Sequence, residues 1–198
     1  AAYRGAKGYT SSLDEAVVKL GFTVLRNIVA AVGLYELASE SGKELSGVFR
    51  CWEHSLLVAE LMRQMVPGTD TASRDTAYLV GLYHDLPEFI LRQEFSQDFE
   101  SLLFEAQSRN ISWEEQVLTS FRISYDELAD LLLTQLGVPS IIKTPLVQFS
   151  IALAGQQSPV TSRSVEGLML ANAIASGMFC TTTSSSRVMP IRPEAINR

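Results

Sequence analysis

Apolar residues recur along most of this chain at the three- and four-residue spacing of an α-helix. After Gly21, one such face contains Leu25, Ile28, Val29, Val32 and Tyr35. A stripe of this kind buries one side of a helix against a core. No segment shows a sustained alternation of β-branched and polar residues between hairpin turns, which strands would require. The pattern predicts an all-α fold, in which several helices form a compact bundle.

Capping and breaking residues set the expected helix ends. The Ser-x-x-Glu pattern, in which each side chain can satisfy a free backbone N–H, occurs at Ser12, Ser112 and Ser124 and predicts a helix start at each. Pro87 lies inside a continuous helical pattern, so we expect a kink there, because proline removes the backbone hydrogen bond to residue 83. Helices are expected over residues 48–66, 73–95, 139–155 and 164–179, and the helix that starts at Ser124 is expected to end at Gly137, after its apolar stripe over residues 128–136.

The composition indicates one domain and narrows its partners. Of 198 residues, 46% are hydrophobic, so we expect a single helical domain over residues 1–180 with a polar tail over 181–198. A net charge of −6 without a basic cluster argues against a nucleic-acid-binding protein. Residues 167–180 form the longest weakly charged stretch, which is too short to span a bilayer. We expect a buried core helix there and no membrane insertion. Having only two cysteines suits a reducing, cytoplasmic location.

The two histidines of the chain are candidates for a metal site. His54 and His84 lie in apolar helical stretches, and Asp85 follows His84 directly. If their helices form an antiparallel hairpin, the three side chains can converge on one point. Imidazole nitrogens and a carboxylate suit a divalent ion such as manganese, iron or zinc, and a water on that ion could become a nucleophile. The alternative is that both histidines belong to the core, where backbone carbonyls or neighbouring side chains satisfy them.

The stretches around these residues are similar to a known family. EHSLLVAELM at residues 53–62 and RDTAYLVGLYHDLPEFIL at residues 74–91 resemble the HD superfamily, in which a first His precedes a His-Asp doublet. SLDEAVVKLG at residues 12–21 and DELADLLLTQLGVPSII at residues 126–142 make the resemblance closer to the HDOD branch, a signalling output domain. The resemblance implies an all-helical fold and a role in bacterial signal transduction. Because family members usually carry further helices upstream, we expect the front of the family domain to be missing here.

Several positions depart from the pattern of catalytic HD proteins. The resemblance places Asn172 where active hydrolases carry a final Asp, and Asn offers a neutral carbonyl where the site needs an anion. The two histidines and one aspartate alone provide a charge of −1 against an ion of +2, so metal affinity should fall. Relatives that bind two metals use extra histidines where this chain has Tyr125 and the Gln148-Phe149 pair.

The neighbours of the candidate ligands leave some alternatives open. Pro87 stands where the family usually has Gly, so the local helix geometry is expected to differ. Glu88, one turn after His84, could supply a carboxylate, although a solvated helix charge is the more common role. We expect Cys51 to be a buried, inert thiol. Trp113 lies in the first turn of a helix, where it could be exposed.

These departures favour a protein that acts by binding rather than by hydrolysis. We expect a non-catalytic HDOD-type output domain that acts through a protein partner in signalling. His54, His84 and Asp85 would then form a vestigial or weak metal site, and no cofactor would be required. The first alternative is a metal-dependent phosphohydrolase or phosphodiesterase of the HD superfamily. The second is a sensing domain that binds a nucleotide or another small ligand without turnover.

Overall fold

The computed structural model describes residues 29–30, 32–33, 46–67, 71–155 and 162–179. All the regular secondary structure in these ranges is helical, as the apolar spacing predicts. The expected helix start at Ser12 and the expected tail over residues 181–198 lie outside the described residues. The helices are α3 (Ser46–Met65), α4 (Thr71–Tyr83), α5 (Leu86–Glu94), α6 (Ser96–Arg109), α7 (Trp113–Phe121), α8 (Tyr125–Gln135), α9 (Ser140–Leu153) and α10 (Arg163–Phe179).

Most helix ends agree with the expected ones. The ends of α3, α8, α9 and α10 lie within three residues of their expected positions. Ser112 and Ser124 are N-caps that accept hydrogen bonds from the backbone N–H groups of Glu115 and Glu127, and Ser124 with Glu127 completes the capping box. The sequence pattern missed α6, whose N-cap is Phe95 and has no side-chain cap hydrogen bond, so no capping signal marks its start.

The expectation of a kink at Pro87 is wrong. The expected helix over residues 73–95 is two helices, α4 and α5, separated by a turn at His84 and Asp85. Pro87 lies in the first turn of α5, where a backbone N–H has no intrahelical partner to lose. The chain therefore breaks the helix before the proline, and the His-Asp doublet lies in the turn between two helices.

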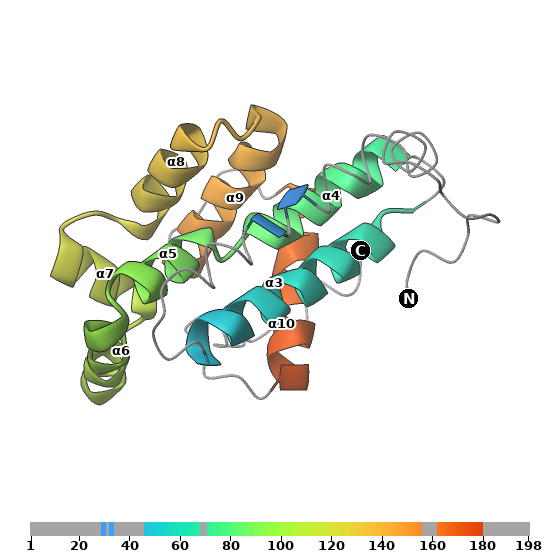
Figure 1. Ribbon diagram of the computed structural model, residues 1–198. Coiled ribbons are helices and arrows are strands. Elements are labelled where there is room, and N and C mark those ends of the chain that lie inside the picture. The colour runs from blue at the N-terminus through green and yellow to red at the C-terminus, as the bar shows by residue number, and fades with distance from the viewer. Residues whose placement is uncertain (1–28, 31, 34–45, 68–70, 156–161, 180–198) are drawn as a thin grey trace, which may run out of the picture.

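The core joins the helices in two main groups. Figure 1 shows α3 and α4 side by side and antiparallel, with α10 packed against α3, α9 against α4, and α8 against α9 and α5. The larger apolar cluster draws buried side chains from these helices and α5, among them Val58, Val80, Leu133, Phe149 and Leu168. A second cluster holds α5, α6, α7 and α8 together through Leu91, Phe99, Trp113, Val117 and Tyr125. Trp113 is therefore buried in the core and not exposed.

α3 and α4 approach each other closely at Gly81. A Cβ atom at this position would lie 2.5 Å from the Ala59 Cα and 2.8 Å from the Val58 carbonyl oxygen. Such distances are far inside van der Waals contact, so only glycine lets the two backbones meet here. His54 lies one turn before Val58, and Asp85 lies four residues after Gly81. The close crossing thus limits how far His54 on α3 lies from His84 and Asp85 in the turn after α4.

The last helix was expected to be a buried core helix, and it is buried on one face. Leu168, Ala171 and Ala175 are inaccessible to solvent, whereas Leu170 is 45% and Met178 is 71% exposed. None of the helices in the described ranges is long and apolar enough to cross a membrane.

Candidate metal centre

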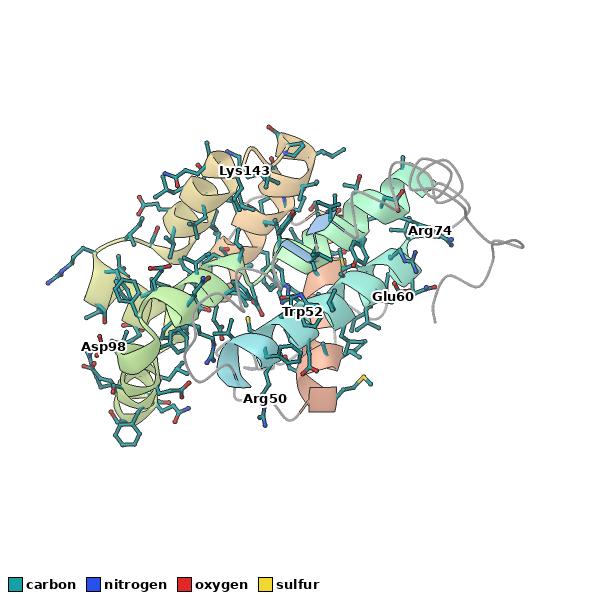
Figure 2. The ribbon with its side chains drawn as sticks, viewed as in Figure 1. Arg50, Trp52, Glu60, Arg74, Asp98 and Lys143 are labelled. Carbon is teal, nitrogen blue, oxygen red and sulfur yellow. The ribbon has the colours of Figure 1, made fainter. Side chains whose placement is uncertain are left out.

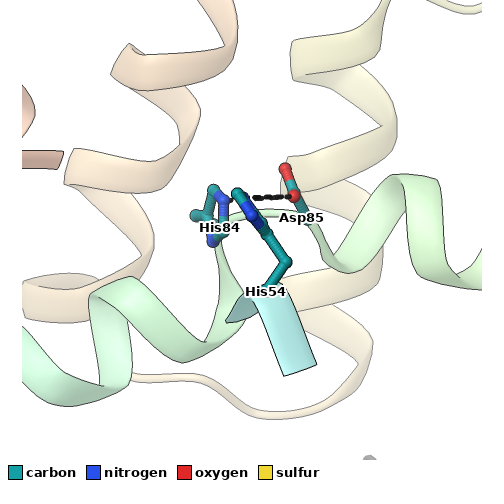
Figure 3. A group of neighbouring side chains, drawn as sticks. All are labelled: His54, His84 and Asp85. Carbon is teal, nitrogen blue, oxygen red and sulfur yellow. Dashed lines mark ion pairs between the residues drawn. The ribbon is translucent and has the colours of Figure 1, made fainter. Parts of the chain in front are cut away.

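Two helices and one turn place four polar side chains at one point inside the bundle. His54 comes from the middle of α3, His84 and Asp85 from the turn between α4 and α5, and Asn172 from α10. Their relative exposures are 0%, 2%, 1% and 4% respectively. Figure 3 shows His54, His84 and Asp85 pointing toward one another. The structure thus brings the three sequence-predicted ligands together, with Asn172 beside them.

The spacing of the donor atoms suits a single divalent ion. One donor atom from each of His54, His84 and Asp85 lies within 4.8 Å of the other two. Asp85 Oδ2 is 3.6 Å from His54 Nε2 and 3.1 Å from His84 Nε2. Donors about 2.1 Å from an ion lie roughly 3.0–3.5 Å from their neighbours in octahedral or tetrahedral geometry. This group of three could therefore hold a metal ion.

The ring of His84 is oriented as metal-binding imidazoles usually are. Its Nδ1 lies 2.8 Å from the Gly81 carbonyl oxygen, so Nδ1–H donates to the backbone and Nε2 faces Asp85. Burial lowers the pKa of His84, but the Asp85 carboxylate and the Gly81 carbonyl outweigh burial, and the net result is a raised pKa. Without a metal, His84 therefore favours the protonated form, paired with Asp85. A metal ion would have to displace that proton.

Asn172 is the hydrogen-bond partner of the His54 ring. The Asn172 Oδ1 atom lies 2.8 Å from His54 Nε2, and because a carboxamide oxygen only accepts, the ring donates its proton there. Burial lowers the pKa of His54, which favours the neutral ring. His54 Nδ1 is buried and has no hydrogen-bond partner among the described residues. Asn172 thus takes up the same ring nitrogen that a metal ion would need.

The resemblance places Tyr125 and the Gln148-Phe149 pair where two-metal relatives are expected to carry extra histidines, and these residues supply no ligand here. Tyr125 is buried, and burial followed by the nearby Asp85 and Glu88 carboxylates raises its pKa, so it remains a neutral hydroxyl. The Phe149 ring meets His84 edge-on at 5.9 Å between centroids and forms an apolar wall. Gln148 is half-buried. The residues therefore fit one metal ion with three protein ligands, and no second site forms among the residues described.

Glu88 is not a solvated charge on a helix surface, which is the more common role of a residue in such a position. Its side chain is fully buried and pairs with Arg92 at 2.9 Å from Oε1 to Nε. Arg92 also reaches Glu100 at 3.2 Å, and its guanidinium lies 4.2 Å from the centre of the Phe99 ring. Arg92 is not among the candidate residues predicted from the sequence, although its spacing of four residues from Glu88 favours an ion pair on one helix face. Because Glu88 is held by Arg92, it does not complete the ligand set.

Cys51 lies close to this ion pair, one turn before His54. It is fully buried, and burial followed by Glu88 and Asp85 raises the pKa of its thiol. A raised pKa keeps the sulfur protonated, and a protonated thiol is a poor nucleophile. These properties agree with the expectation of an inert buried cysteine.

Comparison with known proteins supports the resemblance drawn from the motifs. Residues 1–148 match the HDOD domain family, and this range includes His54, His84 and Asp85 but ends within α9, before Asn172. Among curated proteins and solved structures, none matches the chain. Because the family match spans well over half of the sequence, the chain belongs to the HDOD domain family.

Proposed function

We propose that this HDOD domain is a non-catalytic signalling output domain of a bacterial cytoplasmic protein, which acts by binding a protein partner. In this proposal His54, His84 and Asp85 are a weak or vestigial metal site. The polar cluster then serves mainly to hold α3, the α4–α5 turn and α10 together.

The observation that carries the proposal is the contact between Asn172 and His54. The 2.8 Å hydrogen bond occupies a ring nitrogen that a metal would need, and Asn172 contributes no negative charge. The lowered pKa of His54 favours a neutral ring, and the raised pKa of His84 favours an ion pair with Asp85, an arrangement that needs no metal ion to compensate the Asp85 charge. All four side chains are at most 4% exposed. A hydrolase would instead need its metal and attacking water to be open to substrate.

Replacing Asn172 by Asp tests the role assigned to this residue. The variant gains a fourth potential ligand and a second negative charge. Losing a residue that only supports a metal ligand costs up to about 100-fold in metal affinity, so gaining a direct ligand should tighten metal binding at least about 100-fold. Without metal, the buried carboxylate lacks compensation and the variant should unfold at a lower temperature than the parent. Elemental analysis of protein purified without chelators or a histidine tag, and thermal unfolding with EDTA or Mn²⁺, measure both effects.

Two controls separate metal binding from folding. Asp85→Asn keeps the side-chain volume and removes the charge, and the His84→Ala, Asp85→Ala double variant removes two candidate ligands. We expect little metal in the parent and in both controls. Near one equivalent of metal in the parent, with metal-dependent phosphodiester hydrolysis that both controls lose, would overturn the proposal.

The second candidate function is a metal-dependent phosphohydrolase or phosphodiesterase of the HD superfamily. The convergence of His54, His84 and Asp85 within 4.8 Å favours it, because that spacing fits an ion. It requires the ion to displace Asn172 from His54 Nε2 and a movement that admits substrate. The turnover measurements on the parent and the two controls decide between the two functions.

A further inference from the structure

A small apolar patch lies at the end of the molecule formed by α5, α6 and α7. Phe95 joins α5 to α6 and is 41% exposed, and Leu118 on α7 is 50% exposed. The ring of Phe121, the last residue of α7, lies 5.0 Å from that of Phe95 between centroids. Leu118 is one turn before Phe121, so the two share a helix face. We call Phe95, Leu118 and Phe121 the aromatic patch.

The backbone holds the aromatic patch in place. The Phe95 N–H donates to the Leu91 carbonyl at 3.0 Å, and the Phe95 carbonyl accepts from the N–H groups of Asp98 and Phe99 at 2.9 and 2.8 Å. Phe121 packs against the second core cluster. A preformed surface of this kind loses little conformational entropy when a partner binds, and aromatic side chains contribute strongly to protein interfaces.

Three carboxylates lie within one helical turn, along the chain, of residues of the aromatic patch. Glu94 precedes Phe95, Asp98 lies one turn further on, and Glu115 lies one turn before Leu118. All three are exposed, and none of them forms an ion pair within the described ranges. Figure 2 labels Asp98 at this end of the molecule, whereas the labelled basic residues belong to α3, α4 and α9. The rim of the patch is therefore acidic.

The surrounding helices increase this negative charge. Residues 86–122 contain seven acidic and three basic side chains. Arg92 pairs with Glu88 and Glu100, and Arg109 pairs with Glu105. Arg122, next to the patch, remains to offset the three rim carboxylates. The potential in front of the aromatic patch is thus negative, and it attracts cationic groups.

We propose that the aromatic patch binds a basic amphipathic segment of a protein partner. An apolar face of that segment packs on Phe95, Leu118 and Phe121, while its Lys or Arg side chains meet Glu94, Asp98 and Glu115. A second copy of this chain is a poorer occupant, because a symmetric contact would bring the same carboxylates of both copies together. This inference rests on the proposed function, since it names the surface and the chemistry of the partner.

The probe is a labelled synthetic helical peptide with Leu on one face and Lys on the other, and its counterpart with Glu in place of Lys is the charge control. Fluorescence anisotropy at low salt measures binding to the full chain. Leu118→Ser removes the exposed anchor and should weaken the Lys peptide about tenfold. Glu115→Lys should weaken it by a similar factor and flatten its salt dependence. Leu131→Ser is the matched control, because Leu131 on α8 is 48% exposed, and it should leave binding unchanged.

Some results overturn the inference without touching the proposed function. Equal binding of the Lys and Glu peptides, or equal weakening by Leu118→Ser and Leu131→Ser, removes the aromatic patch as the docking site. Self-association of the free protein that Leu118→Ser abolishes assigns the patch to a second copy instead. Hydrolysis is measured on the same samples in a separate assay. Metal-dependent hydrolysis together with peptide binding that requires the aromatic patch overturns the proposed function and leaves the inference about the patch intact.

Discussion

Replacing Gly81 by Ala tests whether the close crossing of α3 and α4 determines the packing of this domain. The added methyl carbon would lie 2.5 Å from the Ala59 Cα and 2.8 Å from both the Ala59 nitrogen and the Val58 oxygen. All three are backbone atoms, which cannot move aside as a flexible side chain can. To restore ordinary contact at about 3.5–4.0 Å, the two helices must separate by more than an ångström at this point.

The size of the effect follows from two opposing terms. Overpacking a core costs about 1–3 kcal/mol, and a clash with backbone belongs at the upper end of that range. Ala in place of Gly in a helix recovers about 1 kcal/mol. We therefore expect Gly81→Ala to lower the free energy of unfolding by about 2 kcal/mol. For a chain of this size, that corresponds to a fall in Tm of about 4–8 °C.

Gly167→Ala is the matched control, because Gly167 on α10 also faces α3. There the added carbon would lie 3.6 Å from the Met62 sulfur, an ordinary contact with a flexible side chain, so the variant should be unchanged or up to about 1 kcal/mol more stable. Urea unfolding followed by circular dichroism gives both values. If Gly81→Ala proved as stable as the parent, the close crossing would not determine how α3 and α4 pack.

Three further effects follow from single contacts. Ser124→Ala should destabilise the chain by about 1 kcal/mol in denaturant unfolding, because α8 loses its N-cap. The backbone and side-chain hydrogen bonds of Ser124 lower the pKa of Glu127 in the folded state. Glu127 therefore adds to folding stability above its unfolded-state pKa, and this stabilisation is lost as the pH falls through its folded-state pKa. In Ser124→Ala, folding stability should fall less steeply as the solution is made acidic. Arg92→Met removes the Arg92 guanidinium from the buried Glu88 carboxylate and should cost about 3–5 kcal/mol, whereas adding Glu88→Gln should recover part of that loss. Iodoacetamide should modify Cys51 only when the chain unfolds, because the thiol is buried and its pKa is raised. Peptide mass mapping of native and unfolded protein measures the labelling, and modification of Cys51 in the native protein would contradict the prediction.

The helical elements were largely predictable because their signals are local. Apolar spacing, the Ser124 box and the glycine after α8 act within a few residues, and Gly137 indeed adopts a positive φ of 67°. The start of α6 carries no such signal and was missed. Pro87 was misread because a proline inside a helical pattern is compatible with either a kinked helix or the first turn of a new one.

The residues of the candidate site were predictable from the sequence, but their hydrogen-bond partners were not. The order of His54, His84 and Asp85 resembles the HD pattern, and their convergence needed only an antiparallel pair of helices. The hydrogen bond between His54 and Asn172 joins residues 118 positions apart. No local pattern can show that Asn172 meets His54 Nε2, because that depends on how α10 packs against α3.

The sequence by itself determined an all-helical chain, its main helix boundaries and its HDOD character, because helix periodicity, capping and motif spacing are encoded by neighbouring residues. Only the tertiary structure decided which polar side chains are buried and which partner each one has. In the structure, Glu88 is a buried partner of Arg92 and not a surface charge. Phe95 and Leu118 are exposed on an acidic face. Burial depends on how helices that are distant in sequence pack against one another. Because removing a charge from water is costly, a buried charged side chain has to lie beside a compensating partner.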